Sequence, residues 1–362
     1  MIKKSFIDDF YENSPFEMLY ENGVSPNELK ASIISTYQPY FRNQDRLREY
    51  SIDWLVSGWV NFTKLKKNDW CLTNFEKCLS LFNSAKDANE IECIQAVALW
   101  VPEINKAVTK FWSFKNLSSD LEELGILDFT EESFKIVGQF LEGIIKSYLR
   151  LVVHLGRLSR GKSTKKEDIL RLDLGGLVDE LISTTDFSEL FNPPPWNVRL
   201  NQWRNIAYHH NVEVMGDTIS CWYGKEPNVI HIPLSREKLE SLLKVVVNIY
   251  NTIKNAEIVF IFDNLIEYQK ACRKAGIEEL DIRNEVSQLE LFSGISSQGF
   301  KVVDYQLKGD TSKITLRDLI DDDVRKRAIH SSQFLYHLWL HTKVQNVVVE
   351  YINFDGNPYL LS

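Results

Sequence analysis

Residues 134–155, FKIVGQFLEGIIKSYLRLVVHL, decide the fold of this chain. Their apolar residues recur every three or four positions, which predicts one long amphipathic helix with a single buried face. Thr130 is the expected N-cap, because the acidic residues Glu131 and Glu132 after it suit the first turn of a helix. A helix with one apolar stripe must bury it against other elements, so this stretch indicates a helical bundle.

The sequence after this helix predicts three more helices and a small β insertion. A polar connector over 159–166 leads to the second helix, and three consecutive prolines precede the third. Two strand-like runs joined by residues 215–217 (MGD) predict a hairpin, and Ser235 is the expected N-cap of the last helix. The predicted helices cover 168–182, 196–208 and 236 to about 274, and the predicted strands cover 212–214, 218–223 and 228–232.

The regions on either side differ in pattern from this bundle, so we expect three domains. The first region is helical in pattern and rich in tryptophan, and an acidic stretch follows it. The last region alternates like a hairpin around Gly309 and Asp310, with a helix and another strand after it. The expected fold is mainly α: an N-terminal helical domain (1–128), a four-helix bundle with a small β-hairpin insertion (129–275) and a small C-terminal α+β domain (276–362).

Composition indicates a folded cytoplasmic protein. Of the 362 residues, 44% are apolar and 12% aromatic, which suffices for a sizeable core. The net charge of −8 argues against a protein that coats nucleic acid with its whole surface, so any RNA contact should be confined to one region. Five cysteines show no disulfide framework, and no apolar run is long enough to span a bilayer. We expect no membrane segment and no cofactor.

The candidate functional residues lie within residues 204–210, RNIAYHH, near the end of the third predicted helix of the bundle. On a helical projection the apolar residues of this helix share one face, while Asn201, Asn205 and His209 form a stripe on the opposite face. His209 is therefore expected to point away from the core. His210 projects close to the apolar stripe, as a hydrogen-bonded core histidine would.

Arg204 and His209 are suited to cutting RNA without a metal ion. Arg204 lies between the two faces, and its long side chain can reach the polar one. A guanidinium can clamp a phosphate through two hydrogen bonds, and an imidazole exchanges protons near neutral pH. His209 would deprotonate the ribose 2′-OH or protonate the leaving 5′-oxygen, while Arg204 would stabilise charge on the phosphate oxygens.

The same stretch resembles the Arg-x4-His motif of HEPN domains, and the resemblance covers residues 130–274. It implies an endoribonuclease with Arg204, Asn205 and His209 as catalytic residues and His210 as the alternative at the longer spacing that the family allows. It also implies a homodimer in which two Arg-His pairs form one cleft. A toxin or antiviral defence effector, with a regulatory protein partner, is a further implication. Tyr208 departs from the small residue that many members carry before the histidine.

A basic zone precedes this motif. Between residues 142 and 171 there are eight basic and three acidic residues, a local contrast in an acidic protein. The zone is a candidate footprint for an RNA backbone, and the alternative is a solvated helix end whose cations suit the helix C-terminus. The expected RNA-binding residues are Arg157, Arg160, Lys162, Lys165 and Lys166.

Three other patterns favour no separate function. Residues 156–163 (GRLSRGKS) match the phosphate-binding P-loop formally, but they follow a helical periodicity instead of a buried strand. His337 and His341 have helical i, i+4 spacing without an evident third ligand, so we expect no metal site. Arg325 and His330 repeat the Arg-x4-His spacing, but an acidic helix start followed by a solvated basic turn explains them.

Two functions therefore remain open. The first is a homodimeric endoribonuclease acting on RNA such as tRNA. The second is a HEPN-like module without catalysis, which binds a nucleotide, RNA or a protein partner through the same surface. An approach of His209 to Arg204 between chains would favour the first, and burial of both residues against their own chain would favour the second.

Overall fold

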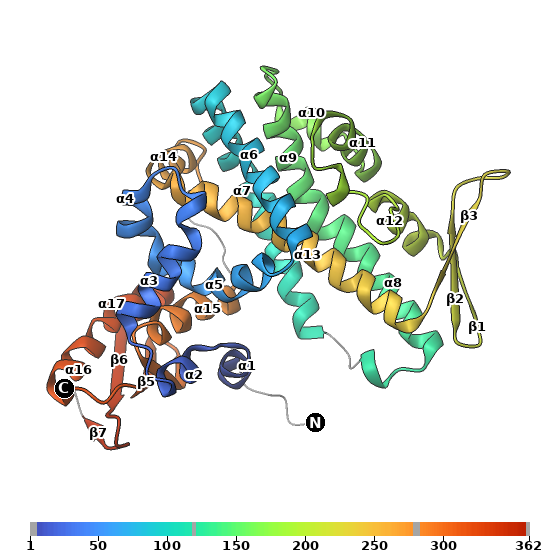
Figure 1. Cartoon of the computed structure of the whole chain (residues 1–362). Coiled ribbons are helices and arrows are strands. Elements are labelled where there is room, and N and C mark those ends of the chain that lie inside the picture. The colour runs from blue at the N-terminus through green and yellow to red at the C-terminus, as the bar shows by residue number, and fades with distance from the viewer. Residues whose placement is uncertain (1–5, 118–120, 278–282, 360–362) are drawn as a thin grey trace. The chain divides into compact units, whose positions relative to one another are not determined.

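The chain is mainly helical, with one three-stranded and one four-stranded β-sheet (Figure 1). The computed structural model describes residues 6–117, 121–277 and 283–359. Its contacts divide the chain into two compact units, Met1–Lys64 with Ile282–Ser362 and Leu65–Asp281. The predicted fold class is confirmed: helices dominate, a small sheet follows the motif, and a second sheet lies near the C-terminus.

Long helices form the centre of the unit 65–281. The helix α6 (Asp69–Ala88) packs along α9 (Lys146–Ser159) and α13 (Arg236–Asp263), and α7 (Glu90–Leu117) packs against α9. Because α6 and α7 bury their apolar faces on the helices of the predicted bundle, they belong to the same unit. The predicted boundaries at residues 128 and 275 therefore do not coincide with the two units.

The stretch 134–155 is helical throughout. The helix α8 (Ile126–Phe140) continues through a π-helical turn (Leu141–Ile145) into α9. The prediction of Thr130 as the N-cap is wrong, because the helix begins after Gly125 and Thr130 donates its hydroxyl to the carbonyl of Ile126 (2.6 Å) from within the helix. π-Helical turns are rare and often occur at functional sites, which directs attention to this one.

Two predicted helices have different bounds. The segment predicted as one helix over 168–182 is divided into α10 (Lys166–Leu170) and α11 (Leu174–Thr184), and the side chain of Asp173 caps α11. The helix α12 (Leu200–His209) begins later than predicted, because the backbone of Asn197 adopts a left-handed conformation (φ 52°) that a helix cannot contain.

The insertion after α12 forms a three-stranded antiparallel sheet in the order β1-β2-β3, which confirms the predicted hairpin and its third strand. The strands are β1 (Val212–Met215), β2 (Thr218–Tyr223) and β3 (Ile230–Leu234). The hydroxyl of Ser235 accepts the backbone N–H of Lys238 (3.4 Å) and so caps α13, as predicted. The predicted continuation to Lys274 is interrupted at Asn264, after which α14 (Leu265–Lys274) follows.

The helix α13 forms part of the core of this unit. Its Tyr250 ring lies 4.8 Å from that of Phe111, 5.8 Å from that of Phe140 and 5.4 Å from that of Tyr148, measured between centroids. Of the helices in the described part of the chain, only α13 is long and apolar enough to cross a membrane, and 56% of its most apolar window is buried inside the protein. These contacts are typical of a core helix.

The other unit combines both ends of the chain. Its sheet has the order β4-β5-β6-β7, with β5 and β6 parallel and the other pairs antiparallel. The strands are β4 (Phe300–Lys308), β5 (Thr311–Asp318), β6 (Asn346–Ile352) and β7 (Pro358–Tyr359). The helices are α1 (Phe6–Asn13), α2 (Phe16–Glu21), α3 (Pro26–Tyr37), α4 (Gln44–Arg46), α5 (Ile52–Lys66), α15 (Asn284–Ser296), α16 (Val324–Ser332) and α17 (Phe334–Thr342).

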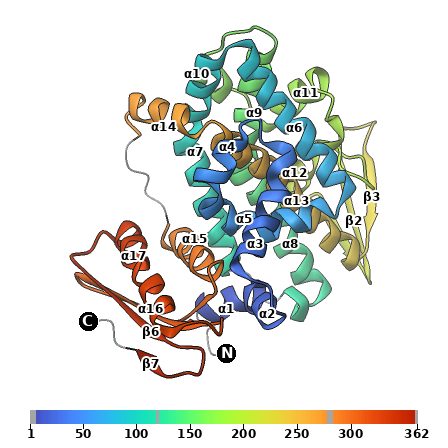
Figure 2. The ribbon, with the colours of Figure 1, turned by 60° about the vertical axis from the view of Figure 1, so that its left-hand side comes forward.

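Polar contacts join the N-terminal helices of this unit to its sheet. The hydroxyl of Tyr11 accepts the backbone N–H of Val302 (2.6 Å), and Lys301 pairs with Glu17 (2.7 Å). The helices α15 to α17 lie beside the sheet (Figure 2). The single helix predicted between the C-terminal hairpin and the last strand is in fact two helices, α16 and α17.

Candidate functional site

The helix α12 is fixed by an apolar face and by one close backbone approach. Leu200, Trp203 and Ile206 are fully buried on this face. On the next turn Ala207 meets Gly138 of α8, where an added Cβ would lie only 3.0 Å from the Cβ of Ala207. A side chain at residue 138 would therefore crowd α12, and glycine lets α12 lie close to α8 and to the π-helical turn that follows it.

A pocket of about 330 Å³ lies where α12 meets that turn. It is lined by Glu142, Lys146, Asp173, Arg204 and Tyr208. Arg204 and Tyr208 are one helical turn apart on α12, and Glu142 and Lys146 are one turn apart across the π-helical segment. Two cations, two carboxylates and a phenol thus meet at one opening.

Glu142 lies between the two cations of this pocket, Lys146 and Arg204. One of its oxygens, Oε1, accepts a hydrogen bond from Lys146, and the other, Oε2, lies 3.6 Å from Nε of Arg204. That distance exceeds a hydrogen bond, and among the described residues neither Oε2 of Glu142 nor Nε of Arg204 has a hydrogen-bond partner, although both atoms are buried. Buried polar atoms normally find a hydrogen-bond partner, and here the two atoms face each other as a long ion pair that no hydrogen bond completes.

Glu142 and Lys146 were not among the site residues predicted from the sequence, where they counted only toward the charge of the basic zone. The signal that marks them is their position: Leu141, Ile144 and Ile145 around them are completely buried, so an acid–base pair at i, i+4 interrupts an otherwise apolar stretch. Such a pair beside a close helix crossing indicates a polar site.

His209 does not line this pocket in a single chain. Five residues separate it from Arg204, which places the two side chains roughly 140° apart around the helix. The side chain of His209 is exposed, as predicted from the helical projection. Asn205 is half-buried and donates a hydrogen bond from Nδ2 to Oε1 of Gln202 (3.4 Å), away from the pocket.

The prediction that His210 lies near the core is wrong. The helix ends at His209, and His210 takes a left-handed conformation (φ 52°, ψ 37°) as its C-terminal cap. The helical periodicity therefore no longer describes its direction, and its side chain is exposed. Both histidines are accessible to solvent at the junction between α12 and β1.

Most cations of the predicted RNA-binding set are engaged in ion pairs. Arg157 donates two hydrogen bonds to Glu180 (2.8 and 2.7 Å), and Arg160 lies 3.5 Å from the same carboxylate. The hydrogen bonds from Arg157 lower the pKa of Glu180. Lys166 pairs with Glu103 (2.8 Å) and also donates to the carbonyl of Leu99.

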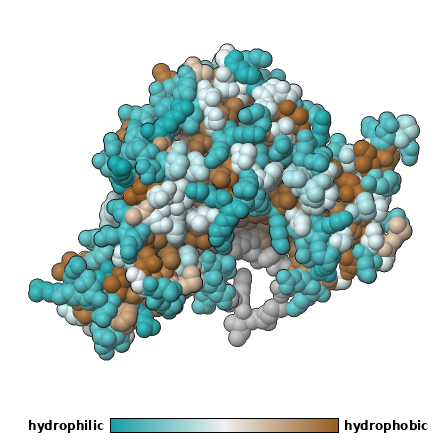
Figure 3. Space-filling view, viewed as in Figure 1, coloured by the Kyte–Doolittle hydropathy of each residue, from teal (hydrophilic) through white to brown (hydrophobic). Residues whose placement is uncertain are grey.

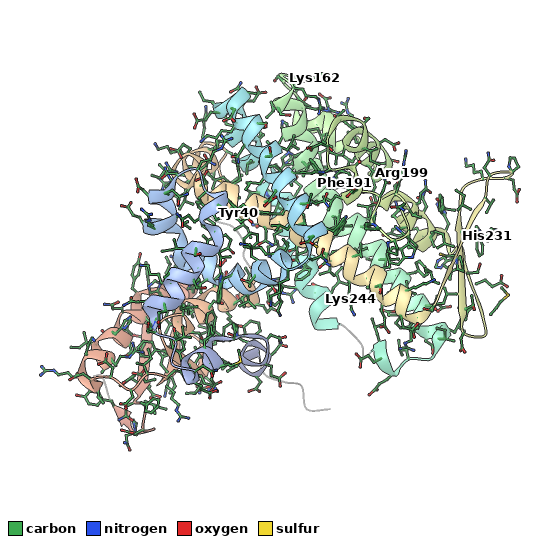
Figure 4. All side chains as sticks on the ribbon, in the orientation of Figure 1. Tyr40, Lys162, Phe191, Arg199, His231 and Lys244 are labelled. Atoms are coloured by element: carbon green, nitrogen blue, oxygen red, sulfur yellow. The ribbon has the colours of Figure 1, made fainter. Side chains whose placement is uncertain are left out.

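Lys162 and Lys165 remain exposed after α9, and Figure 4 labels Lys162 at the tip of its loop. Within the described residues neither lysine forms an ion pair, so this loop retains two available cations of the five predicted. The excess of basic residues counted along the sequence therefore exceeds the positive charge that is available on the surface.

The other patterns have structural explanations. Gly156 is buried within α9, so residues 156–163 are a helix end followed by a turn instead of a phosphate-binding loop after a strand. The described residues contain no group of three or more His, Cys, Asp and Glu side chains arranged to hold a metal ion. His341 shares a hydrogen bond with the hydroxyl of Ser287 (2.7 Å), and His330 shares one with Gln298 (2.6 Å).

Comparison of the chain with protein-family models, with curated proteins and with solved structures finds no match. The chemistry at α12 must therefore be judged from the geometry of the pocket and from the motif it contains.

Proposed function

We propose that this chain is a metal-independent endoribonuclease of the HEPN type, with Arg204 and His209 as its central catalytic residues. The observation that carries the proposal is the pairing of an accessible pocket around Arg204 with an exposed histidine at the end of the same helix. In this mechanism, Arg204 binds the non-bridging oxygens of a phosphodiester.

The reaction follows from the chemistry of these two groups. His209 accepts the proton of the ribose 2′-OH, whose oxygen then forms a bond to phosphorus. The bond from phosphorus to the 5′-oxygen breaks, the leaving oxygen takes up a proton from water, and His209 releases its proton to solvent. The products are a 2′,3′-cyclic phosphate and a 5′-hydroxyl, and Arg204 stabilises the charge that builds on the phosphate in between.

A second copy of the chain completes the proposed site. Because His209 points away from the pocket of its own chain, a homodimer with α12 near its symmetry axis would bring His209 of one copy toward Arg204 of the other. Lys146 adds a second cation for the phosphate, and Glu142 holds Arg204 in place between substrates. Asn205 contributes a polar side chain on the same face as His209.

The cellular setting is part of the proposal. The five cysteines are free thiols, four of them buried, which suits the reducing cytoplasm where RNA is available. A toxin or antiviral defence effector controlled by a regulatory partner fits an enzyme that cuts cellular RNA such as tRNA. No separate cofactor is required by this chemistry.

A second candidate function is a HEPN-like module without catalysis, which binds a nucleotide, RNA or a protein partner. One observation favours it: Glu142 is close to both Arg204 and Lys146, so each cation already has a carboxylate within its own chain. A site neutralised in this way can bind without cleaving.

The test is cleavage of total cellular RNA and purified tRNA in the presence of EDTA, with the new ends mapped. Wild type is compared with His209→Ala and with His210→Ala, the adjacent exposed histidine, as a matched control. Loss of cleavage in the His209 variant alone, with 2′,3′-cyclic phosphate ends from wild type, supports the enzyme. Binding of RNA without cleavage by folded wild type supports the second candidate instead.

A further inference from the structure

The helices α16 and α17 carry an unusual charge for this protein. The segment 324–346 contains Arg325, Lys326, Arg327 and Lys343 and no carboxylate, although the whole chain has a net charge of −8. Arg327 is buried against Asp318, and Lys326 pairs with Asp322. Within the described residues Arg325 and Lys343 form no ion pair, so both remain available to an anion.

One face of α17 is anchored and the other presents aromatic rings. Phe334 and Leu338 are buried, and the ring of Phe334 packs edge-on against Phe300 of β4 (5.4 Å). On the other face, Tyr336 is 63% exposed and Trp339 is 43% exposed. Hydrophobic residues also reach the surface of this unit in the space-filling view (Figure 3).

These rings and the free lysine form one column along the helix. The centroids of Tyr336 and Trp339 lie 6.1 Å apart with their planes inclined by 32°, and Nζ of Lys343 lies 4.6 Å from the Trp339 centroid. Tyr336 and Trp339 are i and i+3 and therefore share one surface of the helix, and Lys343, which caps the helix in a left-handed conformation (φ 55°), is placed there by its contact with the Trp339 ring. Lys343 ends the helix and is itself exposed, so its ammonium group can leave the ring for a phosphate.

We propose that the exposed face of α17, formed by Tyr336, Trp339 and Lys343, binds single-stranded RNA. Unpaired bases stack on the two rings and a backbone phosphate binds Lys343, since every base has a flat face and each nucleotide carries a phosphate beside it. Arg325 and Lys343, unpaired among the described residues, favour a negatively charged partner, and the two exposed rings favour one that also carries flat bases. The inference rests on the proposed function for the identity of the partner, and it assigns RNA binding to a unit outside the catalytic pocket.

The experiment measures binding of a fluorescent 12-nucleotide single-stranded RNA to the full chain by anisotropy, at two salt concentrations. Every protein carries His209→Ala, so that cleavage does not interfere. Trp339→Leu and Tyr336→Leu each remove a ring while keeping an apolar side chain, and Lys343→Gln removes the charge. Phe354→Leu is the matched control, because Phe354 is 47% exposed and lies outside α17 in the same unit.

Trp339→Leu and Tyr336→Leu should each weaken RNA binding about fivefold or more, as expected for one lost base stack, and Phe354→Leu should leave it unchanged. Lys343→Gln should reduce the salt dependence of binding. Unchanged affinity in both ring variants, or no RNA binding by the parent, overturns the proposal. A change in molar mass instead of RNA affinity in the Trp339 variant also overturns it and identifies a protein interface.

The proposed catalytic activity is tested separately, by measuring RNA cleavage by the chain with His209 intact. If the chain cleaves RNA and the ring variants bind RNA normally, the proposed RNA-binding surface on α17 is wrong and the proposed enzyme activity stands. If RNA binding depends on Trp339 and the chain with His209 intact does not cleave RNA, the α17 surface stands and the proposed enzyme activity is wrong.

Discussion

Replacing Asp318 by alanine should severely destabilise the unit that contains the four-stranded sheet. Asp318 and Arg327 are 2% and 5% exposed and form a two-pronged ion pair, with the guanidinium Nε 2.9 Å from Oδ2 and the second nitrogen 2.8 Å from Oδ1. The carboxylate also accepts the hydroxyl of Tyr351 (2.8 Å) and the backbone N–H of Ile320 (3.1 Å). Removing the carboxylate leaves the buried Arg327, the buried hydroxyl of Tyr351 and the part-buried N–H of Ile320 without this partner.

The size of the destabilisation depends on the contacts that Arg327 retains once Asp318 is replaced. Its guanidinium still donates to the carbonyls of Gln298 (3.2 Å) and Gly299 (3.1 Å) and lies 3.9 Å from the ring centroid of Phe300. These contacts offset only part of the loss. Breaking a buried pair by removing one partner costs about 3–5 kcal/mol, which corresponds to a decrease of roughly 10 °C in the midpoint of thermal unfolding for this unit.

The assay combines thermal unfolding with hydrogen exchange of the backbone amides in β4 to β6, which localises the effect to this unit. Two controls calibrate it. The double variant Asp318→Ala with Arg327→Met removes both charges and should recover part of the loss. Glu350→Ala breaks a more exposed pair with Lys313 and should cost at most about 1 kcal/mol. A loss of stability in Asp318→Ala as small as that in Glu350→Ala would show that the buried ion pair does not stabilise this unit.

Three further predictions concern the bundle. Burial raises the pKa of Glu257 on α13 to about 8, well above the value of about 4.3 in an unfolded chain. The contribution of this carboxyl to stability is therefore present at low pH and is lost as pH rises toward 8. Glu257→Gln should then raise the melting temperature more at pH 8.5 than at pH 5. An equal rise at the two pH values, measured by thermal unfolding of variant and wild type, would contradict this. Gly138→Val should push α12 off α8 through its clash with Ala207, cost about 1–3 kcal/mol in chemical denaturation and reduce RNA cleavage; normal stability and cleavage would contradict the close approach. Lys162→Glu should weaken RNA binding in a filter assay, while Arg157→Ala should mainly lower stability because its charge is already paired; the reverse order would contradict the assignment of the free cations.

The sequence predicted those elements whose pattern is local. Apolar periodicity identified the helix over 134–155, the hydroxyl of Ser235 marked the start of α13, and residues 215–217 marked the hairpin. Local pattern failed where a single backbone conformation overrides it. Asn197 and His210 both adopt left-handed conformations, so α12 starts later than predicted and His210 leaves the helical projection.

Contacts between distant residues could not be read from the sequence. Glu180 and Glu103 neutralise Arg157 and Lys166 across 23 and 63 positions, which a window of local charge does not register. For the same reason the pairing of Tyr11 with β4 was missed. Glu142 and Lys146 lie beside Arg204 because α12 packs against the π-helical turn, a contact between distant segments that the sequence does not show.

In the proposed mechanism, Arg204 of one copy and His209 of another cut RNA together. The most direct measurement is RNA cleavage in EDTA by wild type, by Arg204→Ala, by His209→Ala and by the two variants mixed and allowed to exchange subunits. This mechanism predicts cleavage by wild type, almost none by either variant alone, and partial recovery in the mixture, because mixed dimers contain one intact Arg204 facing one intact His209. Folded wild type that leaves RNA intact, or variants that cut as well as wild type, would contradict it.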